Sequence, residues 1–249
     1  MFFSQSGSVK KGKKVINGLY YFPEILVLDC NQYIIEDKHS GELALFDAGN
    51  GVSLNGLFEG MKLLDLEPEN ITKVFVTHEH VDHVLGLYPL MEKLGSDPPA
   101  IYAYGITAEI LEKGDESQIF PGNLGISPSM FGINIKKLEV HNLEGLNEIN
   151  IGPDFIFKVY YTPGHSLGSV CYYEPEKKIL ICGDLVFKGG SFGRYDFPGG
   201  SLPTLIKSIK FVSELDVKYL LPGHMGISDN GNQQINLSYR MIQSIGHFY

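Results

Sequence analysis

The segment that decides the fold is THEHVDHVLG, residues 77–86. It gathers His78, His80, Asp82 and His83 directly after the apolar run Val74-Phe75-Val76. Because side chains alternate along an extended chain, His78, His80 and Asp82 project to one side after a buried strand. A helix that starts near Asp82 turns His83 back toward the same space. Four ligand-type groups therefore converge at the C-terminal end of a strand, where open α/β sheets place their sites.

A cluster of this kind is costly without a shared partner. Three half-buried imidazoles and a carboxylate each need hydrogen bonds for their polar atoms. A bound metal ion removes that cost by taking several of these atoms at once. The segment therefore indicates a metal site.

Three further segments place a glycine and a ligand-type residue at the end of a predicted strand. They are TPGHS with His165, ICGD with Asp184 and LPGH with His224. Glycine permits a sharp turn and a close backbone approach there. The remaining histidines, His39, His141 and His247, lack such a context, and we interpret them as structural or surface residues.

Length and composition bound the class of protein. The 249 residues are 43% apolar, and no repeat or linker divides them, so we expect one domain over 1–249. No apolar window spans a bilayer, and no signal peptide is evident, so we expect a soluble, cytoplasmic protein without a membrane partner. The net charge of −9 argues against nucleic acid as a partner. Three cysteines, Cys30, Cys171 and Cys182, are expected to be reduced core thiols. The basic run KKGKK, residues 10–14, is expected to form a solvated flap.

Strands and helices are mixed along the whole chain, which favours an α/β fold with covered sheets. Gly105–Gly132 is expected to be a loop with a short helix, and Ser201 is expected to cap the helix that follows it. The predicted strands are Ile25–Ile35, Leu43–Phe46, Ile71–Val76, Phe155–Tyr161, Val170–Tyr173, Ile179–Ile181 and Val217–Leu221. The predicted helices are Leu54–Leu64, Asp82–Leu94, Leu202–Leu215 and Gln233–Ile245.

In this order, HEHVDH, TPGHS, CGD and LPGH resemble the motifs of the metallo-β-lactamase superfamily of hydrolases, over roughly Ile25 to Gly226. The resemblance implies an αβ/βα four-layer sandwich of two mixed β-sheets with helices outside. It also implies two divalent metal ions and their ligands. One ion would be bound by His78, His80 and His165, the other by Asp82, His83 and His224, and Asp184 would bridge the two. Imidazole and carboxylate ligands without thiolate suit zinc, iron or manganese, and zinc is the expected metal.

The implied mechanism is hydrolysis by a hydroxide that bridges the two metals at Asp82 and Asp184. No separate motif for a strong general acid is evident, which favours a leaving group that needs little protonation. A thiolate, with a free thiol pKa near 8.5, is such a group. We therefore expect a small-molecule thioester or activated ester as the substrate.

Residues 183–201, GDLVFKGGSFGRYDFPGGS, resemble the glyoxalase II-like branch of this superfamily. Arg194 either orients an anionic substrate or supports this loop through Asp196. Glyoxalase II enzymes carry a helical C-terminal domain that helps to bind glutathione, whereas only residues 225–249 follow His224 here. We expect no such domain, and the thiol carrier is left open. LFDAG, residues 45–49, resembles another family element, in which Asp47 either orients a metal ligand or caps a turn.

Three competing functions share these motifs or ligands. Persulfide dioxygenases resemble the same branch and hold one iron at positions that match His78, His165 and Asp184. A nuclease of the RNase Z type is the second, and a metal-binding module without catalysis is the third. The oligomeric state is left open.

Overall fold

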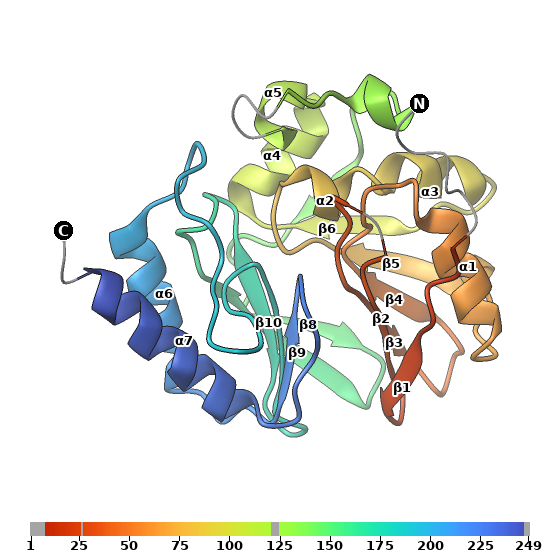
Figure 1. Cartoon of the computed structure of the whole chain (residues 1–249). Helices are drawn as coiled ribbons and strands as arrows, with labels where there is room; N and C mark the ends of the chain where they lie inside the picture. The colour runs from red at the N-terminus through yellow and green to blue at the C-terminus, as the bar shows by residue number, and fades with distance from the viewer. Residues whose placement is uncertain (1–7, 26, 121–124, 247–249) are drawn as a thin grey trace.

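Two β-sheets face each other in the folded chain, and helices cover both outer faces (Figure 1). The computed structural model describes residues 8–25, 27–120 and 125–246. Each sheet combines parallel and antiparallel pairs. The αβ/βα sandwich of two mixed sheets predicted above is confirmed.

The first sheet has the strand order β1-β2-β3-β4-β5-β6-β7. Its first four strands pair antiparallel and the rest pair parallel. The strands are β1 (Lys13–Ile16), β2 (Leu19–Phe22), β3 (Gln32–Glu36), β4 (Leu43–Phe46), β5 (Ile71–Phe75), β6 (Ala100–Ala103) and β7 (Val140–Asn142).

The second sheet has the order β12-β11-β10-β9-β8, with one parallel pair, β11 with β12. Its strands are β8 (Glu148–Ile151), β9 (Phe155–Tyr161), β10 (Val170–Glu174), β11 (Ile179–Gly183) and β12 (Tyr219–Pro222). Strands β9, β11 and β12 run in the same direction, so their C-terminal ends lie at one edge of the sandwich.

Helices form the outer layers, with α6 and α7 against the second sheet and the others on the side of the first (Figure 1). The α-helices are α1 (Leu54–Lys62), α2 (Val81–Val84), α3 (Leu87–Lys93), α4 (Gly105–Lys113), α5 (Glu116–Ile119), α6 (Leu202–Ser213) and α7 (Gly231–Gly246). The 3-10 helices are η1 (Pro68–Asn70) and η2 (Pro128–Phe131). No helix in these described ranges is long and apolar enough to cross a membrane.

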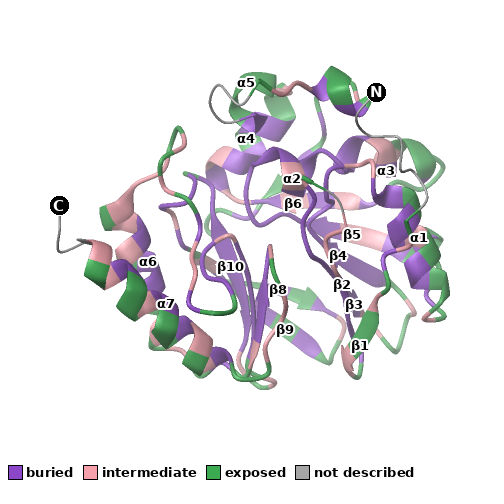
Figure 2. Ribbon diagram, in the orientation of Figure 1, coloured by how far each residue is buried: buried purple, intermediate pink, exposed green. Residues whose placement is uncertain are grey.

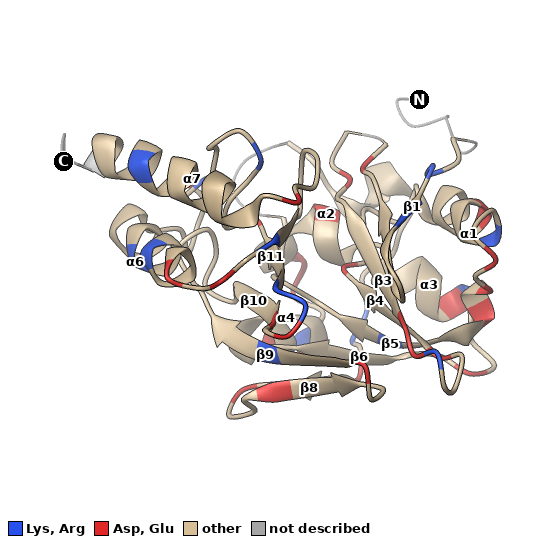
Figure 3. Ribbon diagram, turned by 90° about the horizontal axis from the view of Figure 1, so that it is seen from below, with Lys and Arg blue, Asp and Glu red and all other residues tan. Residues whose placement is uncertain are grey.

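The layers also separate apolar from charged residues. Most strands are buried, while α6 and α7 turn exposed residues outward (Figure 2). Charged residues of both signs are interspersed along the loops and the outer helices (Figure 3). The solvated surface of the sandwich is therefore mixed in charge, and its interior is apolar.

Three apolar cores fill the three interfaces between the layers. The middle core is aromatic. The Phe46 ring lies 5.3 Å from Phe75 and 5.2 Å from Tyr172 of the opposite sheet. The Tyr172 hydroxyl donates to the carbonyl of Val76, at 2.7 Å. This cross-sheet bond holds the end of β5, from which the histidine segment leaves.

The N-terminal part differs most from the sequence prediction. The predicted strand Ile25–Ile35 is wrong for its first part, because only β3 is a strand there, and Leu28 adopts a left-handed φ of 56°. The hairpin of β1 and β2 was not predicted. The prediction of a solvated flap over residues 10–14 is wrong for Lys10, although Lys11, Lys13 and Lys14 are exposed. Lys10 is fully buried, and its Nζ lies 2.8 Å from Asp29 Oδ2 and donates to the carbonyl of Cys30.

The predicted helix Asp82–Leu94 is two helices, α2 and α3, that meet at Leu85–Gly86. A Cβ on Gly86 would lie 1.9 Å from the carbonyl oxygen of Ala48, so the chain needs glycine where it passes the end of β4. Gly105–Gly132 is more helical than predicted, with α4, α5 and η2, while residues 121–124 lie outside the described part. The Ser201 cap is confirmed, because its side chain accepts from the Thr204 amide. The other predicted elements lie within two residues of the observed ones at either end.

Candidate metal centre

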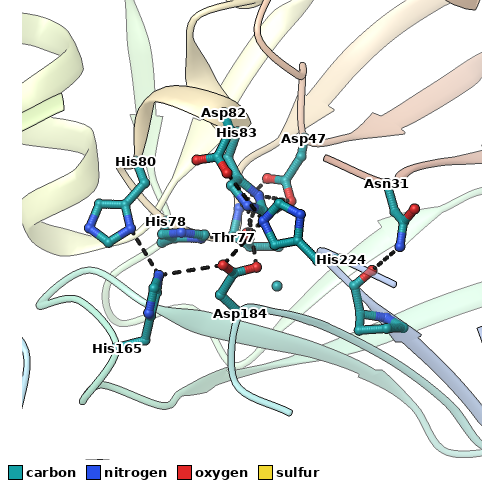
Figure 4. Close-up of polar contacts among 12 residues, drawn as sticks. Asn31, Asp47, Thr77, His78, His80, Asp82, His83, His165, Asp184 and His224 are labelled. Atoms are coloured by element: carbon teal, nitrogen blue, oxygen red, sulfur yellow. Dashed lines mark hydrogen bonds and ion pairs between the residues drawn. The ribbon is translucent and has the colours of Figure 1, made fainter. Parts of the chain in front are cut away.

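Four segments that follow strand ends bring the predicted ligands to one edge of the sandwich (Figure 4). After β5, His78 and His80 precede α2, which carries Asp82 and His83 in its single turn. Asp184 follows β11 directly, and His224 follows β12. His165 lies in the loop between β9 and β10. All seven predicted metal-site residues therefore lie in one cluster.

The ligand atoms form two triads that share one carboxylate. Those of His78, His80 and His165 lie within 4.8 Å of one another, as do those of Asp82, His83 and His224. Asp184 lies between the triads (Figure 4). Its Oδ2 is 3.6 Å from His165 Nε2 and 3.3 Å from His224 Nε2, and its Oδ1 is 3.3 Å from His83 Nε2. The Asp184 carboxylate therefore lies close to histidines of both triads.

Several inward-facing atoms lack hydrogen bonds, which tests whether the residues fit a metal. His78 Nε2, His83 Nε2 and Asp184 Oδ1 are buried and make none. A buried polar atom without a partner costs about 1–3 kcal/mol, so three in one place call for a shared ligand. Divalent cations would take all three atoms. The residues therefore fit divalent cations.

In contrast, the ring nitrogens of four of these histidines that face away from the centre have hydrogen-bond partners. His83 Nδ1 lies 2.9 Å from Asp47 Oδ2, and His165 Nδ1 lies 2.6 Å from the carbonyl of Arg194. His78 Nδ1 lies 3.0 Å from Thr77 Oγ1 and His224 Nδ1 lies 2.7 Å from Glu24 Oε2. Metal-binding histidines usually have such a partner, which fixes the ring and its tautomer. Four imidazoles are therefore pre-oriented with one nitrogen toward the centre.

Burial and neighbouring charges shift the pKa values of the clustered histidines in opposite directions. Burial, together with the neighbouring imidazoles, lowers the pKa of His78 well below its usual value, and burial and His165 lower the pKa of His80 to about 3. These rings are neutral at pH 7, as metal ligation needs. Burial alone would lower the pKa of His224, but the carboxylates of Asp184, Asp82 and Glu24 outweigh it and raise the pKa. Without a cation, a proton on His224 thus balances the carboxylates.

Asp47 contacts a predicted ligand directly. Its Oδ1 accepts from the Thr77 amide at 2.8 Å, while Oδ2 lies at 2.9 Å from both Thr77 Oγ1 and His83 Nδ1. It holds this position from a left-handed turn, with a φ of 58°, just after β4. Of the two roles left open by the sequence, this geometry is that of a residue that orients His83.

Arg194 lies at the rim of the centre in an ion pair. Its Nε and terminal nitrogen lie 2.9 and 2.6 Å from the two oxygens of Asp196, and its guanidinium stacks 4.2 Å from the centroid of the Phe197 ring. Its backbone carbonyl meets His165. A Cβ on the preceding Gly193 would lie 1.9 Å from the carbonyl oxygen of Asp184, so glycine is required for this loop to reach the centre. The contacts are those of the loop-supporting role.

Sequence reasoning missed Glu24 and Asn31. Glu24 accepts from the Met225 amide at 2.9 Å as well as meeting His224. Asn31 Nδ2 donates to the carbonyls of Pro222 and Met225. Both lie in the segment between β2 and β3, far along the sequence from the loop they hold, and no local pattern marks them.

Glu79 was also missed. It is buried inside the HEHVDH motif and accepts from Thr107 Oγ1 and Ser166 Oγ, both at 2.9 Å. It thereby ties the segment of His78 and His80 to α4 and to the loop of His165. Its place between two ligands was visible in the sequence, but its partners were not.

The remaining histidines and the cysteines behave as predicted where they are described. His39 and His141 are exposed, and His141 stacks on Tyr102. His247 lies outside the described residues. The three thiols are free and buried.

A cleft of about 290 Å³ opens beside the centre. It exposes ligands from both triads together with Asp184. A small molecule can therefore reach the shared carboxylate. A four-layer αβ/βα sandwich with this histidine and aspartate cluster in an open cleft has candidate metal ligands where a small molecule can reach them, as a metal-dependent enzyme requires.

Comparison with known proteins identifies the family. The chain belongs to the metallo-beta-lactamase superfamily, whose family model matches residues 25–224. Members of this family use divalent metal ions, and the two triads are where such ions would bind. The hydroxyacylglutathione hydrolases among its relatives agree with the glyoxalase II-like branch indicated by the sequence.

Among the relatives, the probable metallo-hydrolase YqgX of Bacillus subtilis is 36% identical over 202 residues, covering 79% of this chain and 85% of that protein. Hydroxyacylglutathione hydrolase GloC of Haemophilus influenzae is 30% identical over 212 residues, covering 83% of this chain and 89% of that protein. The crystal structure of TTHA1623 in a di-iron-bound form is 29% identical, with a TM-score of 0.64, covering 85% of this chain and 96% of that one.

Proposed function

We propose that this protein hydrolyses thioesters or activated esters at a centre that holds two divalent metal ions. His78, His80 and His165 would hold one ion and Asp82, His83 and His224 the other, with Asp184 between them. The observation that carries this proposal is the position of Asp184 within 3.6 Å of histidines from both triads. The relationship to hydroxyacylglutathione hydrolase GloC supports it.

When bound, the two ions would supply an acidified water and an electrophilic contact for the substrate carbonyl. The chain's own residues prepare the site. Thr77, Asp47, Arg194 and Glu24 fix four imidazoles with one nitrogen inward. Asp184 and ligands from both triads line the cleft, through which the substrate carbonyl would reach them.

The residues that line the cleft also favour a leaving group that departs without a proton. Among the described residues that line the cleft, Arg194 is the one basic residue outside the proposed metal ligands, and it is paired with Asp196. A guanidinium stays protonated and is a poor proton donor. In hydrolysis a carbon–oxygen bond forms, the carbon–sulfur bond breaks, and the thiolate departs with the electron pair. A thiolate needs no proton at that moment, whereas an amide nitrogen does.

The test is a measurement of metal content combined with a substrate panel. The panel contains thioesters, an activated oxygen ester and an unactivated amide. The proposal expects two ions per chain, turnover of thioesters and esters, and no turnover of the amide. One iron per chain with oxygen uptake on a persulfide would instead favour a dioxygenase and overturn the proposal.

A further inference from the structure

The walls of the cleft beside the metal centre are apolar. Five apolar side chains line it: Leu28, Val81, Phe187, Phe192 and Phe197. Three of these are phenylalanines from the loop between β11 and α6. The Phe187 ring lies 5.9 Å from the His224 ring, and the Phe197 ring lies 5.8 Å from the His80 ring. Aromatic surface therefore borders both triads.

Among the described residues that line the cleft, Arg194 is the one basic side chain outside the ligand cluster, and it is paired with Asp196. Both oxygens of Asp196 are engaged by the Arg194 side chain, and the guanidinium face lies over Phe197. The carboxylates that line the cleft, Asp82 and Asp184, belong to the ligand cluster. The two carboxylates of a glutathione thioester, which lie away from the reacting bond, would meet no unpaired cationic side chain among the described residues of this cleft.

The apolar surface, in contrast, is available. Phe192 and Phe197 are only partly buried, and so is Leu28 from the connection between β2 and β3. Removing such surface from water is favourable in proportion to its area. A substrate group that covers these side chains gains binding energy, whereas a charged group loses hydration without compensation.

We propose that the cleft selects thioesters or activated esters that carry a neutral, apolar group next to the reacting carbonyl. This inference rests on the proposed function, because it names the substrate class of the same site. The apolar group is a chain of several carbons or an aromatic ring, and it lies on Phe192 and Phe197. It can belong to the acyl side or to the thiol side of the bond.

The experiment measures kcat/KM of the metal-loaded protein for thioesters of N-acetylcysteamine, a small uncharged thiol. The acyl groups are acetyl, butanoyl, hexanoyl and benzoyl. The acetyl thioester of hexanethiol tests the thiol side, and S-lactoylglutathione is the charged comparison. We expect kcat/KM to rise about fourfold per methylene along the acyl series, or the acetyl thioester of hexanethiol to exceed that of N-acetylcysteamine. S-lactoylglutathione should lie at or below the acetyl thioester.

Variants connect this dependence to the cleft. Phe192→Ala and, separately, Phe197→Ala should flatten the dependence on chain length. The acetyl thioester should be affected less than the hexanoyl thioester in both. The matched control is Phe211→Ala on α6, whose partly exposed ring packs on Tyr160 away from the cleft. It should leave the dependence unchanged.

Two kinds of failure are distinguishable. Equal kcat/KM across the series, or a preference for S-lactoylglutathione that Arg194→Ala abolishes, would overturn this inference and leave the proposed function standing. If no thioester or ester is hydrolysed, the proposed function fails. Binding of hexanoate and acetate, followed by NMR, then decides the inference. Tighter hexanoate binding that Phe192→Ala weakens would retain the apolar site, and equal binding of both acids would overturn it.

Discussion

Glu24 Oε2 lies 2.7 Å from Nδ1 of His224, and its second oxygen accepts from the amide of Met225. One carboxylate thus fixes both the ring and the backbone of the last ligand segment. Glu24 comes from the connection between β2 and β3, on the first sheet, and His224 follows β12 of the second. The pair therefore joins the two sheets immediately beside the centre.

Glu24→Gln is expected to weaken binding of the ion held by Asp82, His83 and His224. Gln keeps a hydrogen-bond acceptor but removes the charge that makes His224 a stronger ligand. Loss of such a supporting partner costs about 10–100-fold in metal affinity. Competition with a chromophoric chelator measures this. Glu109→Gln, at an exposed ion pair on α4, is the control. Equal metal affinities for the unsubstituted protein, Glu24→Gln and Glu109→Gln would show that Glu24 does not support metal binding by His224.

Asp184→Ala is expected to abolish hydrolysis without unfolding the chain. The variant removes the carboxylate that touches both triads, and the loss of kcat/KM should be at least about a thousandfold, the scale of losing one charge-stabilising group. Metal content should fall below two ions per chain. Circular dichroism checks that the fold remains. Retained turnover would contradict the assignment.

Chelation is expected to inactivate the protein and to lower its Tm. Removing the ions leaves His78 Nε2, His83 Nε2 and Asp184 Oδ1 buried without hydrogen bonds. A ligand that binds only the folded state stabilises it by about 2.7 kcal/mol at a hundredfold excess over its Kd. Adding zinc or iron should restore both activity and Tm. The hypothesis fails if the chelated protein turns over substrate at the original rate.

Stability is expected to decrease above pH 9 because of a buried thiol. Burial raises the pKa of Cys171 from 9.0 to about 12. Between these two pH values the Cys171 thiol has lost its proton in the unfolded chain and keeps it in the folded chain. The contribution of this thiol to the free energy of unfolding is therefore fully present below pH 9 and is lost as the pH rises. Each unit corresponds to about 1.4 kcal/mol.

Urea unfolding at pH 8 and pH 10.5 measures this effect, with an expected decrease on the order of 2 kcal/mol from Cys171. Cys171→Ala should show a correspondingly shallower decrease between the two pH values. An identical decrease in both proteins would show that this thiol does not contribute.

Lys10→Ala is expected to destabilise the protein by about 3–5 kcal/mol. The substitution leaves Asp29 charged and buried, since both side chains of this ion pair are fully enclosed. Lys11→Ala is the matched control, because Lys11 is exposed one position further along the chain. Chemical unfolding compares the two variants. Similar small effects would mean that the buried pair contributes little.

The sequence predicted what is local or directly patterned. The ligand segments, the strands that precede them and the layered architecture follow from short motifs and from the resemblance they carry. The hairpin of β1 and β2 was missed because Lys13 and Lys14 stand in its first strand and Lys10 lies before it, a charged run that normally indicates solvent. The burial of Lys10 depends on Asp29, and no periodicity reports that pairing.

Long-range contacts were equally invisible. Glu24 and Asn31 act on residues 222–225, and Glu79 acts through Thr107 and Ser166, so their roles appear only in three dimensions. The break at Gly86 was also missed, because its cause is the Ala48 carbonyl from another segment. The preferences for a small molecule over nucleic acid and for a cytoplasmic location stay predictions.

Each triad takes two members from the segment after β5 and one from the second sheet. A cation in either triad would consequently link the segment that follows β5 of the first sheet to the second sheet. A nascent chain could complete both ion sites only after β12 had been synthesised and His224 had followed it.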